Sequence, residues 1–370
     1  MERGQELFRE HTDRLVAAIT HGKPDRVPVV MSGDAVFARA RGVKMADYVN
    51  DPIRAAQLHV EEILKLGDVD SNMIMIPGSY AFGALYLCNV KVPGRELPEN
   101  DLWQVEEVGL MQESDYDAIL ARGWMPWYQE FLAEKLPVSA ADFAQTQAID
   151  FGKVMMMNVE AGIVPWCIVP TSTPFEILSM ARGVAKFFRD LHRMPDKMEA
   201  VMKIMEVELN EMTRNTTLQT KPLTVFIGMS RGAGEFISPK LFERFVFPFL
   251  KQQVEVIADA GAFSYLHFDS NWTRDLSYFR DLPKGKAIFG TDHSTDIYKL
   301  KEILGGHICI AGDVPASMFV LSNPDEVYDY CRKIIRDIGP SGFVLAAGCS
   351  VPANAKFENV RAMVSAANEG

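Results

Sequence analysis

Short apolar runs recur along the chain, and each is followed by a stretch in which apolar residues repeat at helical spacing. Runs of this length fit parallel strands that are covered on both faces, and the repeats fit amphipathic helices. Eight such pairs predict an α/β fold, the (β/α)8 TIM barrel, with a doubly wound open sheet as the alternative. The predicted strands are residues 27–31, 73–76, 166–169, 224–227, the run that begins at 263, 286–289, 308–311 and 343–346.

Residues 79–160 interrupt this alternation. Within 79–110, Val90 and Val92 lie among turn residues such as Pro93 and Gly94, which predicts a hairpin. Residues 113–160 follow a mostly helical pattern. We therefore expect one barrel domain over residues 1–370, with a hairpin and helices (79–160) inserted between the second and third strands.

The chain of 370 residues is acidic, with a formal net charge of -11. An acidic surface disfavours nucleic acid or an anionic membrane as the main partner. No apolar run is long enough to span a bilayer, and the polar amino-terminal segment lacks the apolar core of a signal peptide. The five cysteines, without a CxxC pair, fit free thiols in a reducing compartment, so we expect a cytoplasmic protein.

The run that begins at Phe263 ends on His267 and Asp269. Side chains alternate faces along a strand, so these two side chains project together at its carboxyl end. In a (β/α)8 barrel the carboxyl ends of all strands form one mouth, and active sites lie there. The other polar or aromatic groups that follow predicted strands are Asp34, Ser230, Arg231, Glu235, Asn271, Trp272, Asp292, His293, Asp313, Cys349 and Ser350.

His267, Asp269 and Cys349 together form a candidate zinc site. Imidazole, carboxylate and thiolate are all zinc ligands, and a catalytic zinc takes three protein ligands and leaves one position open. The alternative interpretation is a hydrogen-bonded pair of His267 and Asp269, with Cys349 as a small buried residue.

Other strand-end groups have two interpretations each. Arg231 either clamps a carboxylate or phosphate of a ligand or forms an internal salt bridge. Asp292, His293 and Asp313 either act as acids, bases and ligand contacts or cap the helices that follow them.

Several segments carry a family pattern, in order along the chain: Pro24-Asp-Arg-Val-Pro-Val29, residues 174–183, residues 237–243, His267-Phe-Asp-Ser-Asn-Trp272, Gly312-Asp-Val-Pro315 and residues 348–359. Through them the chain resembles the uroporphyrinogen decarboxylase superfamily, and its cobalamin-dependent methyltransferase branch more than its decarboxylase branch. The resemblance implies a (β/α)8 barrel. Decarboxylases of the family grip a tetrapyrrole with an arginine-rich first segment, which this first strand lacks.

The methyltransferase relatives move a methyl group between a second molecule and the cobalt of a corrinoid on a separate protein. Thiol-methylating members bind zinc through a His-x-Cys pair and a later Cys. The matching positions here are His267, Asp269 in place of the first Cys, and Cys349. An oxygen ligand makes zinc a stronger Lewis acid, which favours an ether oxygen as its target, whereas loss of the metal is the other interpretation.

The resemblance implies a corrinoid-dependent methyltransferase that acts on a small methyl donor, preferably a methoxylated aromatic, by O-demethylation in one-carbon metabolism. The alternatives are a decarboxylase and a thiol methyltransferase. Zinc and a corrinoid supplied by a partner protein are the expected cofactors, and a homo-oligomer is allowed. The expected catalytic residues are His267, Asp269, Cys349 and Asp292, and the expected substrate-binding residues are Asp34, Arg231, Glu235, Asn271, Trp272, His293 and Asp313.

Overall fold

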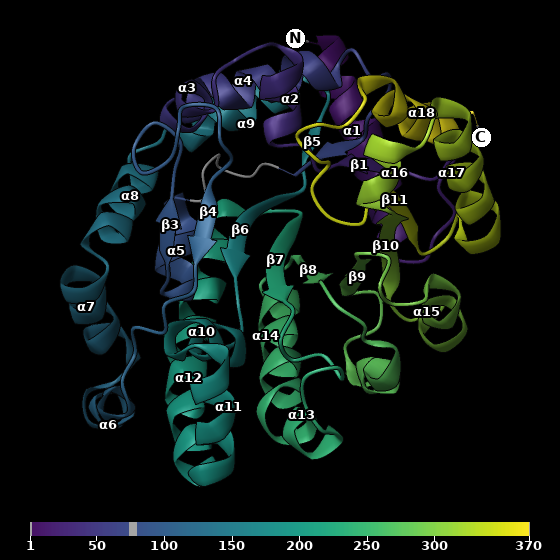
Figure 1. The fold of residues 1–370 in the computed structure, drawn as a ribbon. Coiled ribbons are helices and arrows are strands. Elements are labelled where there is room, and N and C mark those ends of the chain that lie inside the picture. Colours follow the sequence, from purple (N-terminus) through teal and green to yellow (C-terminus); the bar gives the residue numbers. More distant parts are fainter. Residues whose placement is uncertain (1, 74–79, 370) are drawn as a thin grey trace.

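A computed structural model of the chain describes residues 2–73 and 80–369 and shows a parallel β-barrel ringed by helices (Figure 1). The sheet has the order β5-β2-β1-β11-β10-β9-β8-β7-β6, and every pair in it is parallel. Its strands are β1 (Val29–Met31), β2 (Ser71–Asn72), β5 (Val164–Pro165), β6 (Cys167–Thr171), β7 (Thr224–Met229), β8 (Phe263–Phe268), β9 (Ala287–Thr291), β10 (Cys309–Val314) and β11 (Phe343–Ala347).

The two ends of this strand order are one segment of chain. Only Trp166 separates β5, which pairs with β2, from β6, which pairs with β7. The Trp166 backbone N–H donates to the Asn72 carbonyl at 2.8 Å, which continues the β2 pairing through the junction. The sheet therefore closes on itself as an eight-membered barrel, and the predicted fold class is confirmed.

The structure corrects the predicted limits of two strands. β2 consists of the polar residues Ser71 and Asn72 and ends before Met73, where the predicted strand 73–76 begins. Residues 74–76 of that prediction lie outside the described residues. The predicted third strand, 166–169, is part of the interrupted segment β5–β6. The remaining six predicted strands overlap β1, β7, β8, β9, β10 and β11.

Helices surround the barrel and connect its strands. Sequence signals fix several of their ends: Ser238 caps α13 ahead of Pro239, and Asn323 forms a capping box with Glu326 at the start of α17. Apart from those within residues 80–147, the helices of the described residues are α1 (Glu2–Ile19), α2 (Ala35–Ala40), α3 (Met45–Asn50), α4 (Pro52–Ile63), α9 (Phe151–Ala161), α10 (Pro174–Arg182), α11 (Val184–Arg193), α12 (Pro195–Thr220), α13 (Pro239–Phe245), α14 (Phe247–Asp259), the 3₁₀ helix η2 (Thr273–Asp281), α15 (Ile297–Leu304), α16 (Ala316–Leu321), α17 (Pro324–Ile338) and α18 (Phe357–Asn368).

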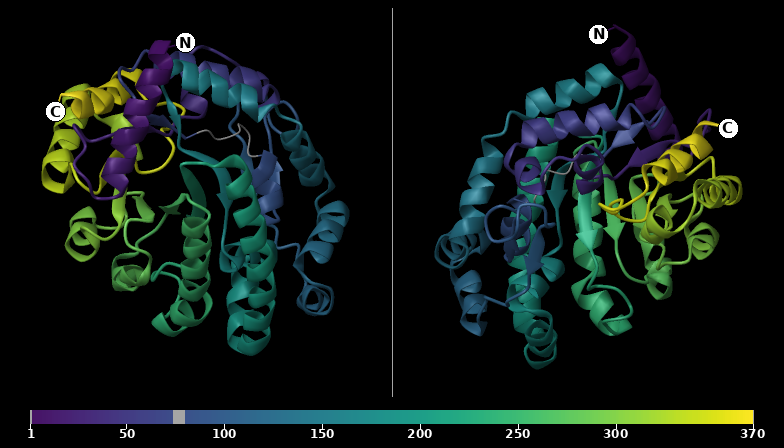
Figure 2. Two further views of the ribbon diagram at one scale, coloured as in Figure 1. Left: turned by 180° about the vertical axis from the view of Figure 1, so that it is seen from behind. Right: turned by 45° about the horizontal axis from the view of Figure 1, so that its top comes forward.

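The segment after β2 contains the predicted hairpin, formed by β3 (Asn89–Lys91) and β4 (Gln104–Glu106), which pair antiparallel. It also contains α5 (Tyr80–Tyr86), α6 (Glu113–Arg122), α7 (Trp124–Lys135) and α8 (Pro137–Gln147). The two views of Figure 2 place α6–α8 on the side of the barrel opposite α17 and α18. Pro137 opens α8, because proline is well accommodated in the first turn of a helix.

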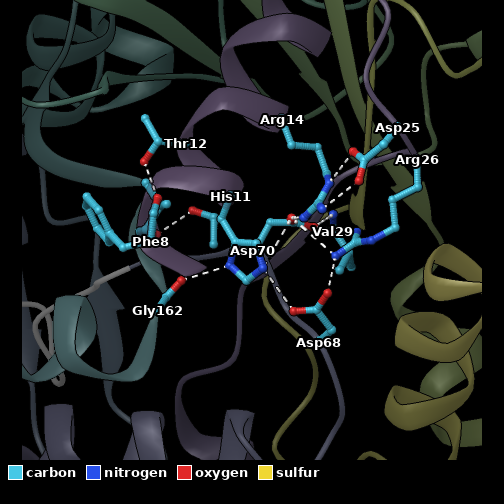
Figure 3. A network of polar contacts seen from close by, with 12 residues as sticks. Phe8, His11, Thr12, Arg14, Asp25, Arg26, Val29, Asp68, Asp70 and Gly162 are labelled. Atoms are coloured by element: carbon cyan, nitrogen blue, oxygen red, sulfur yellow. Dashed lines mark hydrogen bonds and ion pairs between the residues drawn. The ribbon is translucent and has the colours of Figure 1, made fainter. Parts of the chain in front are cut away.

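A buried ionic network holds α1 against the amino-terminal end of the barrel (Figure 3). Asp70, fully buried, pairs with Arg26 at 2.7 Å and accepts the Val29 backbone N–H at 2.8 Å. His11 on α1 lies 2.9 Å from Asp68 and 2.8 Å from the Gly162 carbonyl. The network ties the starts of β1 and β2 together at the end of the barrel away from the mouth, so it supports the fold.

Among the described residues, no helix combines the length and apolar character needed to cross a membrane.

Candidate active site and metal centre

The structure brings His267, Asp269 and Cys349 together at the mouth of the barrel. The Nε2 atom of His267 lies 3.5 Å from Oδ1 of Asp269 and 3.6 Å from Sγ of Cys349. One donor atom from each residue lies within 4.8 Å of the other two. Ligand atoms around a tetrahedral zinc stand about 3.4–3.7 Å apart, given bonds of about 2.0–2.3 Å. The donor set therefore fits a metal ion with little movement.

The protein surroundings shift the pKa values of all three side chains. Burial lowers the pKa of His267, and burial raises the pKa of Asp269. The surrounding protein, aided by the charge of Asp269, raises the pKa of the Cys349 thiol to about 11. Cys349 still reaches solvent, whereas the other four cysteines are buried. It is therefore the accessible thiol among the five, and it is protonated near neutral pH.

Asp292 at the end of β9 braces the loop that follows β8. Its Oδ2 accepts the Ser270 backbone N–H at 3.1 Å, and its Oδ1 accepts the Ser294 backbone N–H at 2.8 Å. Ser270 has a positive φ of 75°, so this bond supports a strained turn directly after Asp269. Helix α15 is capped by Asp296, not by Asp292.

Asp34 connects the first strand end to the last. The Ser350 hydroxyl donates to its Oδ2 at 3.2 Å, one residue beyond Cys349. Burial raises the pKa of Asp34 to about 6, and the Ser350 hydrogen bond only partly offsets this. A carboxyl group with a pKa near neutrality next to a candidate metal ligand is typical of functional sites.

His293 and Asp313 form a separate pair with Tyr330 of α17. The His293 Nδ1 lies 3.0 Å from Asp313 Oδ2, and the Tyr330 hydroxyl donates to Asp313 Oδ1 at 2.8 Å. Asp313 is buried, and burial raises its pKa, whereas the His293 side chain is half exposed. The structure thus joins these two predicted residues to each other and to a helix of the outer layer.

Arg231 forms the internal salt bridge that was one of its two interpretations. Its Nη2 lies 2.6 Å from Glu107 of the inserted segment. The backbone N–H groups of Ser230, Arg231 and Gly232 all donate to one oxygen of Glu176 at 2.9–3.1 Å. Burial raises the pKa of Glu176 to about 7, although these three donors favour its charged form.

The predicted residues after β8 support the loop itself. Asn271 accepts the Thr273 N–H at 2.9 Å, and the exposed Glu235 accepts the Asn271 N–H at 3.1 Å. Trp272 is fully buried, stacks on Phe268 and donates from Nε1 to the Asp269 carbonyl at 2.7 Å. The expectation that Trp272 contacts substrate is therefore corrected: its ring belongs to the core, where the following 3₁₀ helix packs.

Two residues at the mouth lie on helices, so the rule that active-site residues follow strands did not predict them. Tyr86 ends α5 of the insertion, and its hydroxyl lies 3.5 Å from the Gly228 carbonyl beside His267. Glu176 lies in the first turn of α10. Neither position follows a strand, so the only sequence signal was the segment 174–183 that carries the family pattern.

A small cavity in the barrel interior adjoins His267 and Cys349. Its wall is mainly apolar, and three alanines on β10 and β11 keep it open. It has room for about one water molecule. Its lining residues are Val30, Ser32, Met73, Trp166, Tyr265, Ala311, Ala346 and Ala347.

Among solved structures, the chain is similar to a methyltransferase from Methanosarcina mazei, with a TM-score of 0.71 and 17% sequence identity. The match covers 97% of this chain and 98% of that one, so the two share a fold along their whole length. No curated protein matches the sequence. The family model described as uroporphyrinogen decarboxylase (URO-D) matches residues 160–370, which is more than half of the chain and includes His267, Asp269 and Cys349. The chain therefore belongs to the uroporphyrinogen decarboxylase family.

Proposed function

We propose that this chain is a methyltransferase that moves a methyl group between a small methyl donor and the cobalt of a corrinoid carried by a partner protein. The observation that carries the proposal is the convergence of an imidazole, a carboxylate and a thiol at the mouth of a URO-D barrel. The similarity in fold to a methyltransferase supports it. The preferred donor is a methoxylated aromatic, which would be demethylated to a phenol.

Zinc is the proposed metal, held by His267, Asp269 and Cys349. Three protein ligands leave a fourth position open, where the ion would act as a Lewis acid on an oxygen of the substrate. Asp269 supplies a hard oxygen in place of a thiolate, which supports an ether oxygen as the target. The Asp292 bond to Ser270 holds the turn that follows Asp269, so it helps to fix that ligand.

Aromatic side chains beside the metal ligands support an aromatic donor. Phe226 of β7 stacks on the His267 ring with centroids 5.4 Å apart, and Tyr265 lies 5.9 Å from it. Tyr86 adds a third ring from the insertion. Tyr265 and Tyr86 are buried, so these rings keep water away from the imidazole and make its surroundings apolar, which suits an aromatic donor.

The decarboxylase alternative receives less support. Holding a tetrapyrrole polyanion requires free cationic groups, and the guanidinium of Arg231 is paired with Glu107. Asp34, Asp269 and Asp292 give the mouth acidic character instead.

The test is a methyl-transfer assay with a purified corrinoid protein reduced to the Co(I) state. The panel contains aryl methyl ethers, methyl thioethers and methylamines, and loss of the Co(I) absorbance reports transfer. We expect turnover with aryl methyl ethers and none in the His267→Ala/Cys349→Ala double variant. Transfer from thioethers alone would favour the thiol alternative, and silence across the whole panel, with carbon dioxide released from uroporphyrinogen, would favour the decarboxylase.

A further inference from the structure

His267 lies between two glycines in the barrel sheet. In the strand register it pairs with Gly228 of β7 on one side and Gly290 of β9 on the other. A Cβ atom at Gly290 would lie 2.7 Å from the Tyr265 hydroxyl oxygen, and one at Gly228 would lie 2.7 Å from the Tyr86 hydroxyl oxygen. Both distances are too short for real contacts, and the Cβ at Gly290 would also lie 2.8 Å from two ring carbons of Tyr265. Gly290 therefore makes room for the end of the Tyr265 ring, and Gly228 makes room for the Tyr86 hydroxyl.

Tyr265 is the tyrosine that reaches the imidazole. Its hydroxyl oxygen lies 3.5 Å from Nδ1 of His267, the ring nitrogen that faces away from the other candidate ligands. The two residues are two positions apart on β8 and share its interior face. Tyr265 is only 4% exposed and packs edge-on against Trp166, so its hydroxyl has little freedom to turn elsewhere.

We propose that Tyr265 is a positioning residue that holds His267 with its proton on Nδ1 and the lone pair of Nε2 directed at Asp269 and Cys349. A neutral imidazole carries one proton, and the hydrogen bond made by one nitrogen decides which nitrogen keeps it. The phenol hydroxyl can donate or accept at this contact, and in the proposed arrangement its oxygen accepts the Nδ1–H. The Nε2 atom is then an acceptor, as a metal ligand must be, and it is the atom that lies near Asp269 and Cys349.

Tyr86 does not duplicate this role. Its hydroxyl bonds the Gly228 carbonyl at 3.5 Å, on the other side of His267. A phenylalanine at position 265 would fill nearly the same space beside Gly290, so the Tyr265→Phe variant separates the contribution of the hydroxyl from that of packing. The role of Tyr265 in metal binding rests on the proposed metal site. The tautomer of His267, however, can be measured in the chain without metal.

The first measurement uses the full chain without metal, labelled with ¹⁵N-histidine. The chain has seven histidines, and the His267→Gln variant assigns the His267 signals. We expect wild-type His267 in the Nδ1–H form and Tyr265→Phe in a mixture of both tautomers. Identical His267 nitrogen shifts in the two proteins would overturn the proposal.

The second measurement is zinc affinity by competition with a chelator. Loss of a partner that orients a ligand histidine typically weakens metal binding by about 10–100-fold, so we expect at least about tenfold for Tyr265→Phe. The matched control is Tyr128→Phe, which removes a hydroxyl bonded to the Ala84 carbonyl at 3.1 Å, remote from the site, and should leave the affinity unchanged. If wild-type protein binds no zinc, the metal proposal fails and the tautomer measurement alone decides the role of Tyr265.

Discussion

The imidazole Nε2 of His267 lies 3.6 Å from the Sγ of Cys349, although 82 positions separate the two residues in the chain. They belong to β8 and to the end of β11, and β9 and β10 lie between these strands in the sheet. The contact therefore crosses the mouth instead of following a pair of neighbouring strands. Closure of the barrel is what brings the two candidate ligands together.

Replacing Cys349 by Ala should abolish zinc binding. Two remaining ligands hold a divalent ion far more weakly than three, so we expect the affinity to fall by at least about 100-fold, which is about 2.7 kcal/mol. Metal analysis after gel filtration measures the bound zinc per chain. Cys331→Ala, which removes a buried thiol, is the control and should keep its zinc. Full zinc occupancy in Cys349→Ala would contradict the assignment of this ligand.

Replacing Asp269 by Cys should restore a thiolate at the position where the thiol-methylating relatives carry one. A softer ligand binds zinc more tightly, by about tenfold or 1.4 kcal/mol, and makes it a weaker Lewis acid. We expect slower transfer from aryl methyl ethers relative to thioethers in the same corrinoid assay. Asp269→Asn, which removes the charge and keeps the size, should instead weaken zinc binding. An unchanged ratio of ether to thioether rates in Asp269→Cys would refute the role given to the oxygen ligand.

The carboxyl group of Asp34 should destabilise the folded protein above neutral pH. Burial raises its pKa to about 6, above the 3.8 of an unfolded chain. Such a group favours folding while it is protonated, and this contribution is lost as the pH rises through about 6. Asp34→Asn should therefore be more stable than wild type at pH 8 by about 2 kcal/mol, a difference that shrinks as the pH falls from 6 towards 4.

Urea denaturation at pH 5 and pH 8 measures this effect. The control is Asp13→Asn on the exposed face of α1, which should change stability at neither pH. If Asp34→Asn raised the free energy of unfolding by the same amount at both pH values, the carboxyl group would not ionise on unfolding as described.

His11 should stabilise the fold most below pH 6.5. Burial alone lowers its pKa, but the Asp68 and Asp70 carboxylates outweigh that effect and raise it overall. The contribution is complete below the unfolded value of 6.5 and is lost as the pH rises through the raised folded value. His11→Gln should lose about 1–3 kcal/mol at pH 6 and less at pH 9, measured by urea denaturation. Equal losses of stability at pH 6 and pH 9 would mean that His11 contributes through packing alone.

Most strands were predictable because the barrel buries them on both faces, which imposes apolar runs such as Phe343–Ala347. The sequence pattern did not predict β2, since its two residues, Ser71 and Asn72, are polar. Both are buried, and the Ser71 hydroxyl donates to the Val164 carbonyl at 2.6 Å. The helical segment after β6 forms two helices, α10 and α11, because Gly183 adopts a positive φ of 81° between them.

The three candidate ligands were predictable because His267 lies at the end of a strand, Asp269 and Cys349 follow strands, and the barrel gathers strand ends in one place. The direction of a loop side chain is not fixed by that rule. Trp272 turns into the core, and Arg231 turns to Glu107, because each finds a partner there that its own sequence neighbourhood does not reveal. Tyr86 and Glu176 reach the mouth from helices, so only the folded arrangement identifies them.

The barrel closes at Trp166, and this closing point, here called the seam, is linked through Tyr265 to the candidate metal site. Trp166 separates the segment that pairs with β2 from the segment that pairs with β7, and its ring packs edge-on against Tyr265 with centroids 5.5 Å apart. Tyr265 in turn contacts His267. Loosening of the barrel at this seam would therefore reach His267 through Tyr265, so closure of the barrel and the geometry of the three candidate ligands are coupled.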